Sequence, residues 1–458
     1  MNDTICAVST PPGVGGIAVI RLSGQNAFQI FAPIWHGKAI DSLKSHTTHL
    51  GLIADPTTGE HIDEALITVF RAPRSYTGED TVEISVHGSS WIQSRLLKLL
   101  IAQGARLSEP GEFTRRAFVN GNMDLAQAEA VGDLIAARSR AAHRIAASQM
   151  KGSFSHRLNE LRDELLNLAS LLELELDFSD QHVEFASRTR LREAAENILA
   201  EIRRLADSFD RGQAIAEGIP VVIVGETNAG KSTLLNRLIE HDRAIVSEHR
   251  GTTRDTIEEI ATIDDLLFRF IDTAGIRDTH DPVEAMGIER SRQALSKAPI
   301  ILWVVDSTQT AAEIQKAYGD IFTRTDRENK TLIAVLNKTD LARNKQLPEL
   351  SPFGVNAIIP ISAATGEGLP KLRKTIRQLS GITTDESDIT VTNLRHYEAL
   401  TRAAASIEEV IHGLDTDEFP EFLAQSLRET LSILAEITGA VTDTDILTNI
   451  FSHFCIGK

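Results

Sequence analysis

The segment GETNAGKS, residues 225–232, constrains the fold of this chain more than any other stretch. It matches the pattern G-x-x-x-x-G-K-S and lies between a strand-like run, VVIV (221–224), and a helix-like run, TLLNRLI (233–239). In such a loop the backbone N–H groups point at phosphate oxygens, and the lysine neutralises the charge on the β- and γ-phosphates. We therefore expect Lys231 to contact nucleotide phosphates and Ser232 to offer its hydroxyl to Mg²⁺.

Further motifs identify the base. NKTD (337–340) follows a strand-like run, and the carboxylate of Asp340 can accept from two adjacent donors that guanine has and adenine lacks. SAATGEG, which begins at 362, follows the next strand, while DTAG (272–275) and GTTRD (251–255) offer groups for the γ-phosphate and the metal. The sequence thus predicts a GTP site with bound Mg²⁺. The expected nucleotide contacts are Asn228, Ala229, Gly230, Lys231, Ser232, Thr233, Ser247, Glu248, His249, Arg250, Gly251, Thr252, Thr253, Asp272, Thr273, Ala274, Gly275, Asn337, Lys338, Asp340, Ser362 and Ala363.

The hydrolytic group is less conventional. Gly275 is followed by Ile276, where Ras-like enzymes hold a glutamine that orients water, and isoleucine can neither donate nor accept a hydrogen bond. Another group must position the water. Glu284 and Glu289, in DPVEAMGIERSR, are the candidates, and an exposed acidic helix is the alternative interpretation.

The distribution of apolar residues predicts an α/β part and an all-α part. Residues 1–118 mix strand and helix patterns, whereas 119–218 and 384–458 carry leucines at spacings of three and four, which line one face of a helix. Residues 219–383 alternate continuous β-branched runs with helical lengths, which indicates a mainly parallel sheet covered on both faces. We expect a helical bundle interrupted by this α/β domain, with the two helical segments packed together.

Composition limits the compartment and the partners. Two cysteines at opposite ends, Cys6 and Cys455, no basic leader and no apolar run of about 18 residues predict a cytoplasmic protein without a membrane partner. With 47 basic and 64 acidic residues, the net charge is −17, so RNA contact needs a local patch or a partner. The arginine-rich segments 138–144 and 188–192 are candidates, with solvated helix faces as the alternative.

Over essentially its whole length the chain resembles the MnmE (TrmE) family of tRNA-modification GTPases. The nucleotide motifs carry this resemblance together with five others: STPPGVGGIAVIRLSG (9–24), YTGEDTVE (76–83), PGEFTRRAF (110–118), DLAQAEAV (124–131) and the final FCIGK (454–458). It implies an N-terminal α/β folate-binding domain (1–118), a discontinuous helical domain (119–218 and 384–458) and an inserted Ras-like P-loop G domain (219–383).

The resemblance further implies a homodimer formed through the N-terminal domains. It implies a heterotetramer with an FAD-containing partner subunit of the MnmG/GidA type, with FAD only in the partner. Together they would modify carbon 5 of the wobble uridine of certain tRNAs with an aminomethyl or carboxymethylaminomethyl group. The one-carbon unit would come from 5,10-methylene-tetrahydrofolate or formyl-tetrahydrofolate.

Site residues carry over from the resemblance as well. Glu289 would position the attacking water, and K⁺ would replace an arginine finger. Asn122 stands where relatives commonly carry lysine, so an amide replaces one cationic folate contact, and the tail with Cys455 would dock at the folate site. The implied ligands are Asn228, Ser247, His249 and Thr252 for K⁺, Ser232 and Thr253 for Mg²⁺, and Arg21, Glu83, Asn122 and Lys458 for folate.

Three alternatives stay open at this point. A ribosome-assembly GTPase would use the same nucleotide motifs, although no RNA-binding module with a GXXG loop is recognisable. A membrane-remodelling GTPase would need a basic or lipid-anchoring segment, which the sequence lacks. The apolar tail 454–458 has its own alternative, a frayed terminus without a role.

Overall fold

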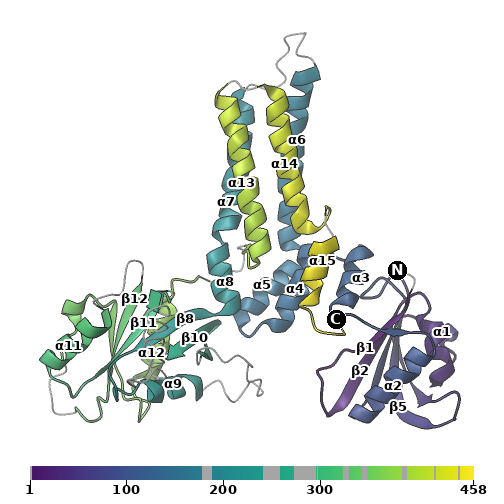
Figure 1. Cartoon of the computed structure of the whole chain (residues 1–458), viewed down its shortest axis with the longest axis horizontal. Coiled ribbons are helices and arrows are strands. Elements are labelled where there is room, and N and C mark those ends of the chain that lie inside the picture. The colour runs from purple at the N-terminus through teal and green to yellow at the C-terminus, as the bar shows by residue number, and fades with distance from the viewer. Residues whose placement is uncertain are drawn as a thin grey trace, which may run out of the picture. The chain divides into compact units, whose positions relative to one another are not determined.

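The chain folds into two compact units, each assembled from separate stretches of sequence (Figure 1). Unit 1 comprises Met1–Ile135, Ala147–Ile202 and Ala399–Lys458, and unit 2 comprises Ala136–Ala146 and Arg203–Glu398. The domain boundaries expected at 118, 218 and 383 stay predictions. The computed structural model describes residues 3–177, 188–240, 258–272, 295–296, 298–322, 330–342, 348–383, 389–416, 419–441 and 444–457.

The N-terminal part of unit 1 is a seven-stranded sheet with the order β3-β4-β5-β6-β2-β1-β7. Its pairs are antiparallel except β1 with β7. Alternate residues of β2, Ala18, Ile20 and Leu22, lie in a core with Leu96 and Leu100 of α2. The elements are β1 (Ile5–Val8), β2 (Gly15–Ser23), α1 (Ala27–Phe31), the 3₁₀ helix η1 (Ala32–Ile34), β3 (Trp35–His36), η2 (Ile40–Ser42), β4 (Thr47–Ala54), β5 (His61–Phe70), β6 (Thr81–Gly88), α2 (Ser90–Ala102) and β7 (Arg106–Leu107).

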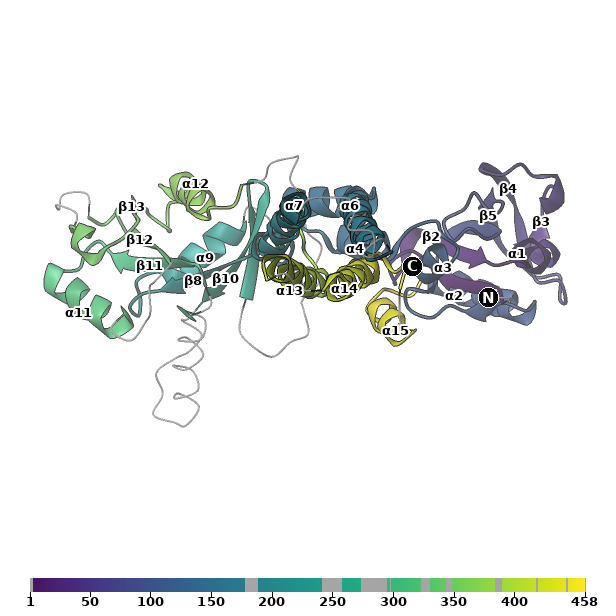
Figure 2. The ribbon, with the colours of Figure 1, turned by 90° about the horizontal axis from the view of Figure 1, so that it is seen from above.

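The rest of unit 1 is helical, and Figure 2 shows its long helices side by side in a bundle. The leucine stripe of α6 is buried as the sequence predicts, and α6 packs along α14, whose Leu423, Leu427 and Leu434 are also buried. The two segments that are distant in sequence therefore pack together. The elements are α3 (Glu112–Val119), α4 (Leu125–Ala136), α6 (Ser153–Asp177), α7 (Arg188–Asp207), α13 (Leu394–Asp415), α14 (Pro420–Thr438) and α15 (Thr444–Ser452).

Unit 2 holds a six-stranded sheet with the order β13-β12-β11-β8-β10-β9, parallel except for β9. Successive residues of β8 point to opposite faces: Val221 packs in a core with Leu234 of α9 and Leu372 of α12, and Val222 packs in a second core with Ile314 of α11. The expected mainly parallel sheet with helices on both faces is confirmed. The elements are α5 (Arg140–Met150), α8 (Phe209–Glu217), β8 (Ile219–Val224), α9 (Lys231–Glu240), β9 (Glu258–Ile263), β10 (Leu266–Asp272), β11 (Ile300–Asp306), α11 (Ala311–Phe322), β12 (Thr331–Asn337), η5 (Ser351–Phe353), β13 (Ala357–Pro360) and α12 (Leu369–Leu379).

Two neighbouring leucines of α6 test the packing of the bundle. Leu165 is completely buried, whereas Leu166 is 41% exposed. We expect Leu165→Ala to lower the free energy of unfolding by about 2–5 kcal/mol, because it leaves a cavity in the bundle core. Leu166→Ala, the matched control, should change it by less than about 0.5 kcal/mol. Urea unfolding followed by circular dichroism measures both, and equal losses would contradict the observed helix phase.

Candidate functional site

The carboxyl ends of three neighbouring parallel strands form the candidate nucleotide site of unit 2. Strands β8, β11 and β12 lie side by side and end at Val224, Asp306 and Asn337. Parallel strands bring the loops that follow them to one edge of the sheet, where α/β proteins bind their ligands. Segments far apart in the sequence therefore meet at this edge.

The loop after β8 has the geometry of a phosphate cradle. Gly225, Asn228 and Gly230 all have positive φ angles, of 151°, 65° and 96°. Such conformations turn successive N–H groups toward one concave side. Lys231 begins α9 and is largely buried, and its Nζ donates to the carbonyl oxygens of Gly225 at 2.7 Å and Glu226 at 2.8 Å. The ammonium therefore lies along the loop that the sequence assigns to phosphate.

Asn337 connects three loops. Its side chain is almost completely buried; Nδ2 donates to the Ala229 carbonyl at 2.8 Å, and Oδ1 accepts from the Ala363 N–H at 2.9 Å. The structure thus brings the phosphate loop, the NKTD loop and the SAATGEG loop together. Ser362 is fully buried beside Ala363, and Asp340 is partly buried.

Lys338 pairs with an acidic residue that the sequence analysis did not single out. Its Nζ lies 2.6 Å from Oδ2 of Asp306, the last residue of β11. Burial raises the pKa of Asp306, but the hydrogen bonds from Lys338 and Thr308 outweigh it, so that its pKa lies below the ordinary value. An aspartate at the end of an apolar strand, in IILWVVD, was the signal that could have identified it.

Part of the expected nucleotide and metal site lies outside the described residues. Ser232 and Thr233 are exposed in the first turn of α9, beside Lys231, where a hydroxyl suits a Mg²⁺ ion next to phosphate. Asp272 ends β10, but its side chain is not described. In the part of the chain that the structure describes, no three His, Cys, Asp or Glu side chains gather as a metal site. The expected residues outside the description are Ser247, Glu248, His249, Arg250, Gly251, Thr252, Thr253, Thr273, Ala274, Gly275 and Glu289.

In unit 1, Arg21 and Glu83 form a cross-strand ion pair on the face of the sheet opposite the core. Arg21 lies between the buried residues Ile20 and Leu22 of β2 and is paired in register with Glu83 of β6. Its Nε and Nη2 donate to Glu83 Oε1 at 3.0 and 2.7 Å. The guanidinium also lies 5.2 Å from the ring of Tyr76, so its position is set by charge and by an aromatic face together.

Asn122 contacts the same loop that carries Tyr76. Its Nδ2 donates to the carbonyl oxygens of Ser75 at 2.9 Å and Tyr76 at 3.1 Å. The amide therefore anchors the loop beside Arg21. The structure brings together Arg21, Glu83 and Asn122, three of the four residues that the resemblance assigns to folate.

The fourth expected folate contact, Lys458, lies outside the described residues, but the tail before it docks on the N-terminal part of unit 1. Ile456 forms an isolated antiparallel bridge with Pro110, and Ser9 Oγ donates to the Gly457 carbonyl at 3.2 Å. These residues of the tail are therefore docked, so the frayed alternative is wrong for them, and their place at a folate site stays a prediction. The thiol of Cys455 is exposed.

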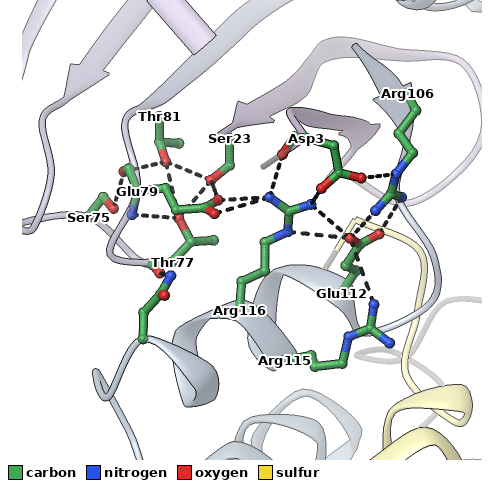
Figure 3. A network of polar contacts seen from close by, with 11 residues as sticks. Asp3, Ser23, Ser75, Thr77, Glu79, Thr81, Arg106, Glu112, Arg115 and Arg116 are labelled. Carbon is green, nitrogen blue, oxygen red and sulfur yellow. Dashed lines mark hydrogen bonds and ion pairs between the residues drawn. The ribbon is translucent and has the colours of Figure 1, made fainter. Parts of the chain in front are cut away.

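A buried ionic cluster joins α3 to the loop before β6 and to the N-terminal segment (Figure 3). Arg116 is almost completely buried and contacts Glu112 at 3.0 Å and Glu79 at 3.1 Å, and its Nη1 donates to the Asp3 carbonyl at 2.8 Å. Glu112 also pairs with Arg106. No sequence motif predicted this cluster, although the spacing of four between Glu112 and Arg116 is visible in PGEFTRRAF.

The carboxylate of Glu112 is ionised in this setting. Its burial raises the pKa, but hydrogen bonds from Arg106, the Glu109 N–H and Arg116 outweigh the burial and leave the pKa below its ordinary value. A buried carboxylate of this kind contributes stability above its unfolded-state pKa, and that contribution is lost as the pH falls through the folded-state pKa.

The arginine-rich segments take part in contacts within each unit. Arg144 lies 3.6 Å from Asp265, while Arg192 pairs with Glu196 and Asp415. These ion pairs favour a structural role for both segments. No described helix is both long and apolar enough to cross a membrane.

Two family models together cover nearly the whole chain. The model described as the MnmE helical domain matches residues 125–455, and the model described as the GTP-binding protein TrmE N-terminus matches residues 4–122. The chain belongs to the MnmE family.

Curated MnmE relatives align with this chain from end to end. The tRNA modification GTPase MnmE of Parabacteroides distasonis is 51% identical over 463 residues, and that of Bacteroides thetaiotaomicron is 49% identical over 468 residues. Both alignments cover 100% of this chain and 100% of the relative. The MnmE resemblance seen in the sequence motifs is thus confirmed.

Solved structures to which part of this chain is similar include a variant of Aquifex aeolicus Era bound to GDP·AlF4⁻. It is 31% identical to this chain, and the match covers 41% of this chain and 65% of the Era chain, with a TM-score of 0.29. A score this low gives the likeness no weight for the fold. The P-loop fold of the MnmE G domain rests instead on the observed strand order and on the Gly225–Ser232 loop.

The pH dependence of stability tests the ionic cluster. We expect Glu112→Gln to lower the free energy of unfolding at pH 7 by about 3–5 kcal/mol, because the buried guanidinium of Arg116 and the partly exposed one of Arg106 lose their shared carboxylate. The deficit should shrink as the pH falls through the folded-state pKa of Glu112, since the wild-type carboxyl group is then neutral as well. Denaturant unfolding between pH 7 and pH 3 measures this. Glu109→Gln, which removes an exposed carboxylate just before α3, should have little effect, and a deficit that does not vary with pH would contradict the assignment.

Proposed function

We propose that this chain is a K⁺-stimulated GTPase that modifies carbon 5 of the wobble uridine of certain tRNAs together with a flavoprotein partner. Its family makes it a GTP hydrolase of tRNA modification, and GTP with Mg²⁺ follows from that. The observation that carries the finer proposal is the pairing of Arg21 with Glu83 in unit 1, the unit on which the tail also docks. A GTPase that acted only as a nucleotide switch has no need of this second polar site.

The nucleotide chemistry divides among three residues of proposed role. Lys231 would neutralise phosphate charge, Asp340 would accept from the guanine edge, and Glu289 would position the attacking water. The carboxylate of Glu289 lies in a segment outside the description, so its role rests on the motif GIER. When bound, K⁺ would offset negative charge that develops beside the β/γ bridge.

The cation would be held by oxygen ligands of two loops. Asn228 has a left-handed backbone conformation and lies at a turn of the phosphate loop. Its side-chain oxygen is a suitable ligand for a hard cation. Ser247, Thr252 and the backbone carbonyl of His249 would complete the K⁺ set. Ser232 and Thr253 would bind Mg²⁺.

The N-terminal site would hold methylene- or formyl-tetrahydrofolate as the one-carbon donor. The Arg21–Glu83 pair offers donors and an acceptor side by side, which suits the edge of a pterin ring, and the ring of Tyr76 stiffens the pair. Because Asn122 is neutral, any cation for the glutamate tail of folate would have to come from elsewhere, and Lys458 is the proposed source. FAD would be carried by the partner subunit, of the MnmG/GidA type, within a heterotetramer built on a homodimer of this chain.

Nucleoside mass spectrometry tests the proposed reaction. In cells from which this gene has been deleted, we expect tRNA to lose the aminomethyl-type groups at the wobble uridine, because neither GTP hydrolysis nor the one-carbon site remains. Expression of the wild-type chain should restore the modification, whereas Glu83→Gln should restore it poorly while GTP hydrolysis by the purified variant stays normal. Modified wobble uridine that persists in the deleted strain would rule the proposal out.

Ion replacement tests the catalytic cation. GTP turnover should fall about tenfold or more when Na⁺ replaces K⁺, because transition-state charge then loses a fitting counter-ion. Glu289→Ala should reduce hydrolysis by about 10²-fold or more while nucleotide affinity stays within about twofold. Phosphate release and equilibrium nucleotide binding measure the two effects. Glu284→Ala is the matched control in the same segment; equal rates in the two salts would argue against the cation role.

A further inference from the structure

The segment between β11 and α11, residues 306–310, contacts two loops of the nucleotide site. At its start, Asp306 Oδ2 lies 2.6 Å from Lys338 Nζ of the NKTD loop. Further on, the Gln309 side-chain amide donates to the Glu226 carboxylate of the phosphate loop. We refer to residues 306–310 as the bridging segment, because it reaches from the base-binding loop to the phosphate loop.

Hydrogen bonds within the bridging segment and to Asn337 hold its conformation. Oδ1 of Asp306 accepts from the N–H of Thr308 at 2.9 Å and from its hydroxyl at 2.7 Å. The Ser307 N–H donates to the Asn337 carbonyl at 2.9 Å. One carboxylate oxygen of Asp306 is thus committed to the segment itself, and the other is directed at Lys338.

Lys338 has a backbone conformation that needs support. Its φ angle is 63°, in the left-handed region that residues with a Cβ atom seldom adopt. Such a conformation persists only where the surroundings hold it. Lys338 is followed two residues later by Asp340, whose carboxylate is the proposed acceptor for guanine. Any relaxation at Lys338 therefore shifts the group that recognises the base.

We propose that Asp306 is a positioning residue for guanine recognition: by holding the ammonium of Lys338 it fixes the NKTD loop, and with it Asp340, against the phosphate loop. Asp306 does not itself touch the nucleotide in this scheme. The inference rests on the GTP site described above. Its effect is on the choice between guanine and related bases, which distinguishes it from a general contribution to folding.

The test compares GDP with IDP, whose base lacks the 2-amino group, on the full chain carrying Asp306→Asn. The wild type should prefer GDP. The variant should bind GDP about tenfold more weakly and lose most of its preference over IDP, because Asp340 no longer meets both guanine donors in the right position. Fluorescent derivatives of the two nucleotides give both dissociation constants.

Glu313, which follows the bridging segment, provides a matched control. Glu313 accepts from the Thr310 N–H and hydroxyl at 2.8 Å each, at the start of α11. Its carboxylate also has a pKa below the ordinary value, because of those same hydrogen bonds. Glu313→Gln removes the same charge close by without altering the Asp306–Lys338 contact, and both affinities should stay within about twofold of wild type.

Asp306→Glu keeps the inference testable if Asp306→Asn folds poorly, and a double-mutant cycle with Lys338→Met adds a second test where Asp306→Asn folds. Asp306→Glu keeps the charge and should recover part of the GDP preference. In a double-mutant cycle, Asp306→Asn and Lys338→Met should have non-additive effects on the ratio of GDP to IDP affinity, because both break one contact. Additive effects, or an equal loss of GDP and IDP affinity, would overturn the inference. A wild-type chain that binds no GDP would instead overturn the nucleotide site itself.

Discussion

The buried amide of Asn337 is the contact on which the nucleotide site of unit 2 depends. It bonds to the phosphate loop through Ala229 and to the SAATGEG loop through Ala363. A buried amide that lost either partner would carry the full cost of an unsatisfied polar group. The amide therefore stabilises the arrangement in which the three loops meet, and the parallel sheet supplies the common edge.

In unit 1 the buried charge of Arg116 likewise joins separate segments of the chain. The guanidinium of Arg116 is satisfied only when the N-terminal segment, the loop before β6 and α3 are all in place. That loop carries Tyr76 and that helix carries Phe113, and the two rings lie 5.2 and 5.5 Å from the guanidinium of Arg21. The ionic cluster thus helps to hold the two rings that contact Arg21 of the proposed one-carbon site, although no residue of the cluster is itself proposed to contact folate.

Local patterns made much of this fold predictable. The apolar run before Gly225 indicates a buried strand, and leucines spaced three and four residues apart along α6 indicate one buried helix face. The nucleotide motifs follow strand-like runs in order along the chain. The sequence alone therefore predicts the inserted parallel sheet and the bundle. The position of Arg21 between Ile20 and Leu22 likewise predicts that it faces away from the core.

The contacts that the sequence did not predict join distant segments. The pairing of Arg21 with Glu83 depends on strand register. The family resemblance named both residues as folate contacts but did not predict that they pair with each other. The contacts of Arg116 with Asp3 and Glu79, and of Lys338 with Asp306, have no periodicity to reveal them. The bond between Ser9 and Gly457 joins residues 448 positions apart. During synthesis on the ribosome, all strands of the sheet that contains β1 emerge long before Gly457, which follows α15. The sheet can therefore form its hydrogen bonds first, and the tail then docks on a surface that is already folded.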